Sequence, residues 1–141
     1  MIYQVIFDTN VLVAAFRSRL GASYKLMTLI EGGRFKLNLS VPLLFEYEAI
    51  LKNDAKISGL SKKDVEETLD YLCQTSRHHK ISYLWRPYLK VPKDDFVLEL
   101  AVAAGCDFIV TFNKKDFVGS EKFGVKIVSP QEFLKIIGEI K

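Results

Sequence analysis

Acidic residues recur where the sequence predicts that strands end and helices begin. They lie after the apolar run 2–7, before a long apolar helix, and after a second apolar run: Asp8, the pair Asp94 and Asp95, and Asp116. The carboxyl ends of parallel strands share one edge of a sheet, so we expect these side chains to meet there. Each aspartate alone is also compatible with an ordinary helix cap. Carboxylates gathered at one edge repel one another unless a cation lies among them, so together they predict a Mg²⁺ or Mn²⁺ site.

A helix predicted after Ser40 carries two glutamates, either of which could join this set. At about 100° per residue, Glu46 and Glu48 flank the apolar face of that helix symmetrically. Glu48 has Lys52 four residues later, which is an ordinary solvated pair. Glu46 has apolar neighbours and no cationic residue three or four positions away. The neighbouring residues therefore favour Glu46.

The elements that must position these acids alternate between strands and helices. Strands are predicted at 2–7, 35–39, 107–111 and 125–128, and helices at 10–17, 21–31, 40–52, 61–76, 94–105 and from 129 onward. The start of the 61–76 helix reads as a capping box, and so does the start of the last helix. This alternation predicts a parallel sheet covered by helices on both faces. Residues 77–93 are the least legible. Within them we interpret 77–80 (Arg-His-His-Lys) as a solvated helix end, and we predict that Tyr83, Trp85 and Tyr88 pack rather than stack on bases.

Composition limits the class of protein. The 141 residues are 49% hydrophobic and 26% charged, which predicts one domain over 1–141 and excludes intrinsic disorder. No apolar run approaches the roughly 20 residues of a membrane-spanning helix, and no signal peptide is apparent. Cys73 and Cys106 lie in apolar contexts and predict reduced core thiols, as in a cytoplasmic protein.

Five segments follow one another at a characteristic spacing along essentially the whole chain: 7–12 (Phe-Asp-Thr-Asn-Val-Leu), 40–47 (Ser-Val-Pro-Leu-Leu-Phe-Glu-Tyr), 92–101 (Pro-Lys-Asp-Asp through Leu-Glu-Leu-Ala), 109–117 (Ile-Val-Thr-Phe-Asn-Lys-Lys-Asp-Phe) and 127–134 (Ile-Val-Ser-Pro-Gln-Glu-Phe-Leu). In these segments the chain resembles the PIN domain family of ribonucleases. Within that family it resembles a small prokaryotic group described as toxin components of toxin–antitoxin pairs. The resemblance implies a three-layer α/β/α sandwich with a short parallel sheet and a carboxylate cluster that holds one or two divalent metal ions.

Carried over residue by residue, the resemblance implies four catalytic acids. These are Asp8, Glu46, Asp94 and Asp116, and the three aspartates are the implied metal ligands. Counting back from Gly105 favours Asp94 as the third acid, whereas counting back from Thr111 favours Asp95. Since gaps are commoner in loops than in helices, we choose Asp94 and place Asp95 beside the site.

Polar neighbours complete the implied site. Thr9, Asn10 and Thr111 are expected to orient the acids or to contact a phosphate. Asn113 stands where many family members carry aspartate, and its neutral amide adds no charge to a second metal site.

The resemblance implies an Mg²⁺- or Mn²⁺-dependent endoribonuclease with RNA as substrate and a cognate antitoxin as partner. The apolar residues Phe16, Leu20, Leu26 and Met27 of the first two helical stretches are predicted to lie in the core, with the interface of a homodimer as the alternative. The charge agrees with the expected RNA substrate. The formal net charge is +3, but without the four acids the remaining 13 acidic residues face 20 basic ones, which leaves +7 for the rest of the chain.

Two alternatives to the ribonuclease function stay open. One is a haloacid-dehalogenase-like phosphatase with Asp8 as nucleophile, and the other is a non-catalytic RNA- or protein-binding module.

Overall fold

The computed structural model of this chain describes residues 2–58, 61–80 and 95–140, and of 54–58 only the backbone. Asp94, Tyr83, Trp85 and Tyr88, the last three predicted to pack rather than to stack on bases, therefore lie outside the described residues.

Five parallel strands form the centre of the fold. In spatial order they are β3 (Arg77–His78), β2 (Phe35–Leu39), β1 (Tyr3–Phe7), β4 (Phe108–Val110) and β5 (Lys126–Val128). In β1, the consecutive residues Val5, Ile6 and Phe7 are all buried, as expected of a central strand covered on both faces. The predicted parallel α/β architecture is confirmed.

The interpretation of residues 77–80 as a helix end is wrong. The preceding helix ends at Thr75, and Arg77 and His78 pair with Asn38 and Leu39 as the edge strand β3. The His79 amide continues this pairing by donating to the Leu39 carbonyl at 2.9 Å. A two-residue polar edge strand has no apolar periodicity, so the sequence carries no local signal for it.

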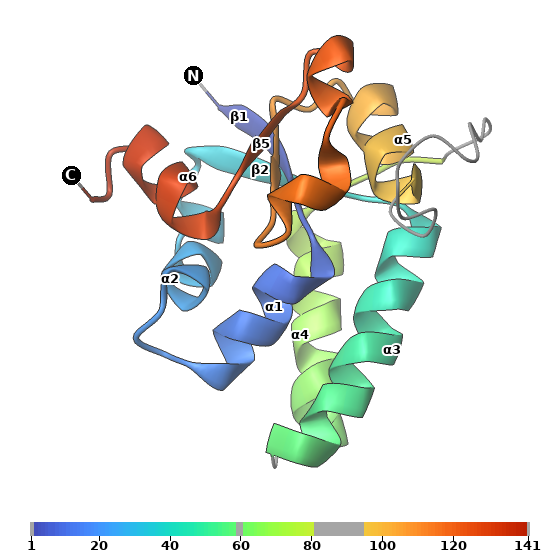
Figure 1. Cartoon of the computed structure of the whole chain (residues 1–141). Helices are drawn as coiled ribbons and strands as arrows, with labels where there is room; N and C mark the ends of the chain where they lie inside the picture. Colours follow the sequence, from blue (N-terminus) through green and yellow to red (C-terminus); the bar gives the residue numbers. More distant parts are fainter. Residues whose placement is uncertain (1, 59–60, 81–94, 141) are drawn as a thin grey trace.

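Helices lie on both sides of this sheet (Figure 1). They are α1 (Thr9–Arg17), α2 (Ala22–Thr28), α3 (Val41–Ser58), α4 (Lys62–Thr75), α5 (Asp95–Ala103) and α6 (Pro130–Ile136), with short 3-10 turns η1 (Ile30–Gly32), η3 (Lys114–Phe117) and η4 (Ser120–Phe123). Helix α1 packs against α2 and α3, α3 runs beside α4, and α2 contacts α6. Helix α5 packs against β1 and β2. No helix in the described ranges is long and apolar enough to cross a membrane.

Side-chain caps set the start of three helices, as predicted. The Ser40 hydroxyl accepts from the Leu43 amide at 3.4 Å at the start of α3. Reciprocal capping boxes open the other two helices, between Ser61 and Asp64 in α4 and between Ser129 and Glu132 in α6. Each cap satisfies amide groups that have no partner inside the helix.

The core is aromatic on the side where α6 covers the sheet. Phe133 is fully buried, and its ring centroid lies 5.4 Å from that of Phe35, 5.5 Å from Phe108 and 6.3 Å from Tyr3. These rings come from α6 and from three different strands, so one side chain joins both ends of the chain to the middle of the sheet.

Both cysteines are free, as predicted. Cys106 is buried just before β4, and this burial, with a smaller effect of Asp107, raises the pKa of its thiol to about 12.

Candidate active site

Asp8 lies at the carboxyl end of β1 and also caps α1. Its Oδ1 accepts from the Thr9 amide at 2.9 Å, and its own amide donates to the Val110 carbonyl at 2.9 Å. Its Oδ2 accepts from the Thr111 hydroxyl at 2.7 Å. The capping interpretation is therefore correct for Asp8, and the cap leaves Oδ2 directed toward the neighbouring strand end.

Thr111 and Asn10 join the ends of β1 and β4. The side-chain Nδ2 of Asn10 donates to Thr111 Oγ1 at 3.2 Å and to Asp8 Oδ2 at 3.4 Å. The backbone amide of Asn113 donates to the same Thr111 oxygen at 3.0 Å. Asn10 Oδ1 accepts from the Phe112 amide at 3.3 Å. These contacts fix the orientation of the Asp8 carboxylate relative to the loop after β4.

Replacing Thr111 with valine removes the centre of this network without changing the side-chain shape. Thr111 is fully buried, and its loss removes one hydrogen-bond partner each from Asp8, Asn10 and Asn113, so the free energy of unfolding is expected to fall by about 1–3 kcal/mol. Urea denaturation measures this change. Thr111→Ser, which keeps the hydroxyl, is the control and is expected to lose less. Equal stability of Thr111→Val and the natural protein would show that the network contributes nothing.

Glu46 reaches the site from α3. Thr9 Oγ1 donates a hydrogen bond to Glu46 Oε2, and the Thr9 backbone amide donates to Asp8 Oδ1. Thr9 is therefore bonded to both acids. Glu48 instead lies 3.4 Å from Lys52 on the solvent side, as predicted for a solvated pair. The structure thus brings Glu46, and not Glu48, into hydrogen-bonded contact with the Asp8 network.

The charges of both acids affect the pKa of the neighbouring Tyr47. Its hydroxyl donates to the Phe7 carbonyl inside the core. Burial raises the pKa of Tyr47 well above its ordinary value of 10.0, and the charges of Asp8 and Glu46 raise it further. Two carboxylates therefore act on one buried hydroxyl at this edge of the sheet.

The raised pKa of Tyr47 predicts a loss of stability at alkaline pH. Below about pH 10 tyrosine is neutral in both states, whereas above it only the unfolded chain ionises this residue, so folding stability falls by up to about 1.4 kcal/mol per pH unit. In Tyr47→Phe this part of the fall is absent. Denaturation midpoints between neutral and alkaline pH measure it. The control is Tyr24→Phe, which removes an exposed tyrosine, and an unchanged alkaline slope in Tyr47→Phe would contradict the prediction.

Two other predicted acids, Asp95 and Asp116, lie on α5 and η3. Asp95 is the first residue of α5 and is 1% exposed. Asp116 is half-buried in η3, where its amide donates to the Asn113 carbonyl at 3.0 Å. Within the described ranges, no three His, Cys, Asp or Glu side chains lie together closely enough to hold a metal ion. Asp94, the predicted third acid, is outside those ranges.

Sequence reasoning did not single out Glu99. This carboxylate is 2% exposed in α5, four residues after Asp95, and therefore lies on the same helix face. The available signal was the spacing of two acids four residues apart in an otherwise apolar helix.

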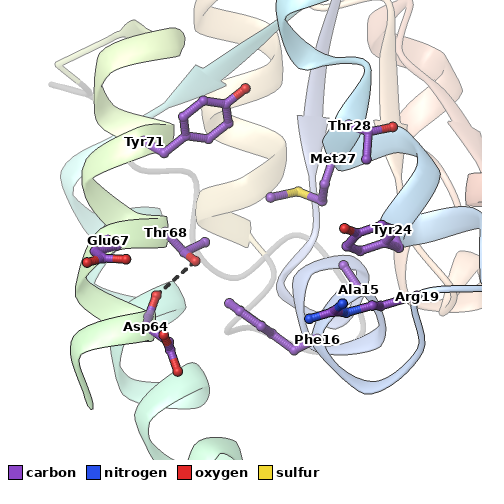
Figure 2. Close-up of a pocket in the computed structure, with 10 residues that line it drawn as sticks. All are labelled: Ala15, Phe16, Arg19, Tyr24, Met27, Thr28, Asp64, Glu67, Thr68 and Tyr71. Carbon is purple, nitrogen blue, oxygen red and sulfur yellow. Dashed lines mark hydrogen bonds between the residues drawn. The ribbon is translucent and has the colours of Figure 1, made fainter. Parts of the chain in front are cut away.

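A separate cavity of about 530 Å³ lies between α4 and the segment formed by α1 and α2 (Figure 2). Phe16, Tyr24, Met27 and Tyr71 supply its apolar lining, and Arg19 faces the acidic residues Asp64 and Glu67 across it. None of the predicted site residues that the structure describes lines this cavity.

Four apolar residues of the first two helical stretches were expected in the core, with a dimer interface as the alternative. Leu26 is buried in the core, whereas Phe16 and Met27 are only partly buried and line the cavity. Leu20 is fully exposed, so the core interpretation is wrong for it.

A family profile described as PIN domain matches residues 4–115 of the chain, which is well over half its length. The chain belongs to the PIN domain family. The match spans Asp8, Glu46 and Thr111 and ends one residue before Asp116. No curated protein sequence matches the chain.

The PIN fold is also found among solved structures. A chain of the crystal structure of VapBC2 from Rickettsia felis, bound to a DNA fragment from their promoter, superposes with a TM-score of 0.59. The two sequences are 18% identical, and the alignment covers 92% of this PIN domain protein and 98% of the VapBC2 chain. At this identity the likeness concerns the fold alone.

PIN domain proteins are generally metal-dependent. The donor chemistry of this PIN domain site is compatible with Mg²⁺ or Mn²⁺, because Asp8 and Glu46 offer the hard carboxylate oxygens that such ions prefer. Both acids also act electrostatically on Tyr47, which means that negative charge is concentrated there.

Proposed function

We propose that this PIN domain protein is a metal-dependent endoribonuclease and the toxin of a toxin–antitoxin pair. The observation that carries the proposal is the connection of Asp8 and Glu46 through Thr9 at the carboxyl edge of the sheet. Two carboxylates held so near each other, in a family that is generally metal-dependent, suit the binding of a cation and of a phosphodiester.

The proposed chemistry is hydrolysis of an RNA phosphodiester by water. A divalent ion bound to Asp8, Asp94 and Asp116 would neutralise charge on the phosphate and lower the pKa of the attacking water. Glu46 would either join these ligands or accept the proton of that water. Thr111 and Asn10 would hold the Asp8 carboxylate in one orientation, while Thr9 would hold Glu46. Attack by water leaves a 5′-phosphate, whereas attack by the RNA 2′-hydroxyl would leave a cyclic phosphate.

The proposed partner is an antitoxin protein, by analogy with the VapBC2 complex. Such a protein would inhibit the enzyme most directly by covering the acidic site with an arginine or lysine side chain. The reading frame next to the gene is expected to encode it, and co-purification of the two proteins would test the pairing.

Exchange of one glutamate at a time tests the assignment of Glu46. Glu46→Gln removes a carboxylate charge from the site and is expected to lower the rate of RNA cleavage in Mg²⁺ by at least about tenfold. Glu48→Gln removes the same charge from the solvent side of the same helix turn and is expected to stay within about twofold. Initial rates on a fluorescent RNA measure both variants. Equal losses in the two, or a loss in Glu48→Gln alone, would contradict the role of Glu46.

A further inference from the structure

Phe112 presents an exposed aromatic ring directly beside the proposed active site. It follows Thr111 where the chain leaves the carboxyl end of β4, and it is 52% exposed although Asp8 and Thr111 are buried. Its ring pairs with no other aromatic ring in the part of the chain that the structure describes. Single exposed apolar residues are ordinary at a protein surface, so it is the place of Phe112 next to the buried Asp8 and Thr111 that distinguishes it.

The backbone beneath this ring is held on both sides. The Phe112 amide donates to Asn10 Oδ1 at 3.3 Å, and the Asn113 amide donates to Thr111 Oγ1 at 3.0 Å. The same Thr111 oxygen donates to Asp8 Oδ2 at 2.7 Å. The attachment point of the ring is therefore fixed relative to the Asp8 carboxylate, and a group fixed in advance loses less conformational freedom when a ligand binds.

The charges that follow the ring suit a polyanion. Lys114 and Lys115 follow in η3, and both are exposed. Lys114 Nζ lies 2.9 Å from Glu132 Oε1, which compensates part of its charge, so we assign Lys115 as the main cation for a phosphate. An exposed aromatic ring next to lysines is the combination by which proteins bind single-stranded nucleic acid, because bases stack on the ring and phosphates approach the ammonium groups. This charge pattern favours RNA over a protein partner as the group that covers Phe112.

We propose that the Phe112 ring stacks on an unpaired base of the RNA beside the phosphate that is cleaved, and so selects the nucleotide at that position. The inference rests on the proposed ribonuclease function and adds a specificity-determining residue to it. Every base can stack on an aromatic ring, but purines offer the larger stacking surface, so a modest preference for a purine is expected there. A base inside a duplex is already stacked and paired, so the same ring disfavours double-stranded RNA.

The test compares Phe112 variants on short fluorescein-labelled single-stranded RNAs that differ at one nucleotide. Phe112→Ala is expected to bind RNA about tenfold more weakly, measured by anisotropy in an Asp8→Asn background, and to raise KM by a similar factor while kcat stays within about twofold. It is also expected to lose the purine preference. Phe112→Trp retains affinity and preference. Phe45→Ala is the matched control, since Phe45 is an exposed phenylalanine on α3 that lines a different hollow with Glu66 and Asp70, and it leaves both unchanged.

An RNA with an abasic position separates stacking from a general loss of folding. Removing the preferred base is expected to weaken binding to the natural protein about tenfold and to cause no further loss in Phe112→Ala. If Phe112→Ala binds and cleaves RNA like the Phe45→Ala control, the stacking role is wrong and the ribonuclease function stands. A changed oligomeric state with unchanged RNA affinity would make the ring a protein contact and likewise overturn it. A natural protein that neither binds nor cleaves any RNA overturns both proposals.

Discussion

Asp8→Asn is expected to lower RNA cleavage in Mg²⁺ by at least about 100-fold while the protein stays folded. The substitution removes a carboxylate charge from the proposed ligand set, and loss of a direct ligand exceeds the 10- to 100-fold effect typical of outer-shell partners. Asparagine keeps a side-chain oxygen that can accept from the Thr9 amide, so α1 remains capped. Cleavage is measured on a fluorescent RNA, and circular dichroism checks the fold.

Asp107→Asn is the matched control for Asp8→Asn. Asp107 also accepts a backbone hydrogen bond, from the Gln4 amide at 2.8 Å, but it precedes β4 and therefore lies at the opposite, amino end of the sheet. Its cleavage rate is expected to stay within about twofold of the natural rate. Undiminished cleavage by Asp8→Asn, or cleavage that persists in excess EDTA, would refute the proposed metal-dependent mechanism.

Phe133→Ala is expected to lower the free energy of unfolding by about 3–5 kcal/mol. The side chain is fully buried and packs against three rings from the sheet, so its removal leaves a cavity between α6 and β1, β2 and β4. A loss of this size is a large part of the total stability of a typical domain. Urea or thermal denaturation measures it.

Ile136→Ala provides the comparison for Phe133→Ala on the same helix. Ile136 is partly exposed, so the same kind of truncation creates no internal cavity, and a loss below about 1 kcal/mol is expected. If both variants lose the same stability, α6 contributes through its helix rather than through the Phe133 ring. The helix lies beyond residues 4–115, so the result also shows how strongly the core depends on the segment after the family match.

The fold was predictable wherever its signals are local. The apolar run of β1 and the capping boxes at Ser61 and Ser129 depend on residues only a few positions apart, and the structure contains all three. Helix α3 runs to Ser58 rather than ending near Lys52, which is a boundary without a strong stop signal in the sequence. The edge strand β3 forms by pairing with β2, about 40 residues earlier, and no local sequence pattern predicts such a pairing.

The site was predictable in part for the same reason. The choice of Glu46 over Glu48 rested on a helix-local ion pair, and that pair with Lys52 is present. The choice of Asp94 over Asp95 rested on counting back from Gly105 through the helix, because gaps are commoner in loops, and it stays a prediction. Asp95 is buried at the first turn of α5, which makes it the other candidate for the third acid. The exposure of Phe112 could not be predicted, because a phenylalanine after a buried strand is equally compatible with a core position and only the tertiary structure shows where its ring lies.

The hydrogen bond between Asp8 and Thr111 joins residues 103 positions apart and has a consequence for synthesis of the protein. Strand β1 emerges from the ribosome before its neighbour β4, which is complete only after Val110 has been made. Pairing of segments so distant in sequence must await translation of the residues between them and makes folding slow. The carboxylate of Asp8 in a nascent chain is therefore held in its final orientation only after Thr111, 103 residues later, has been translated.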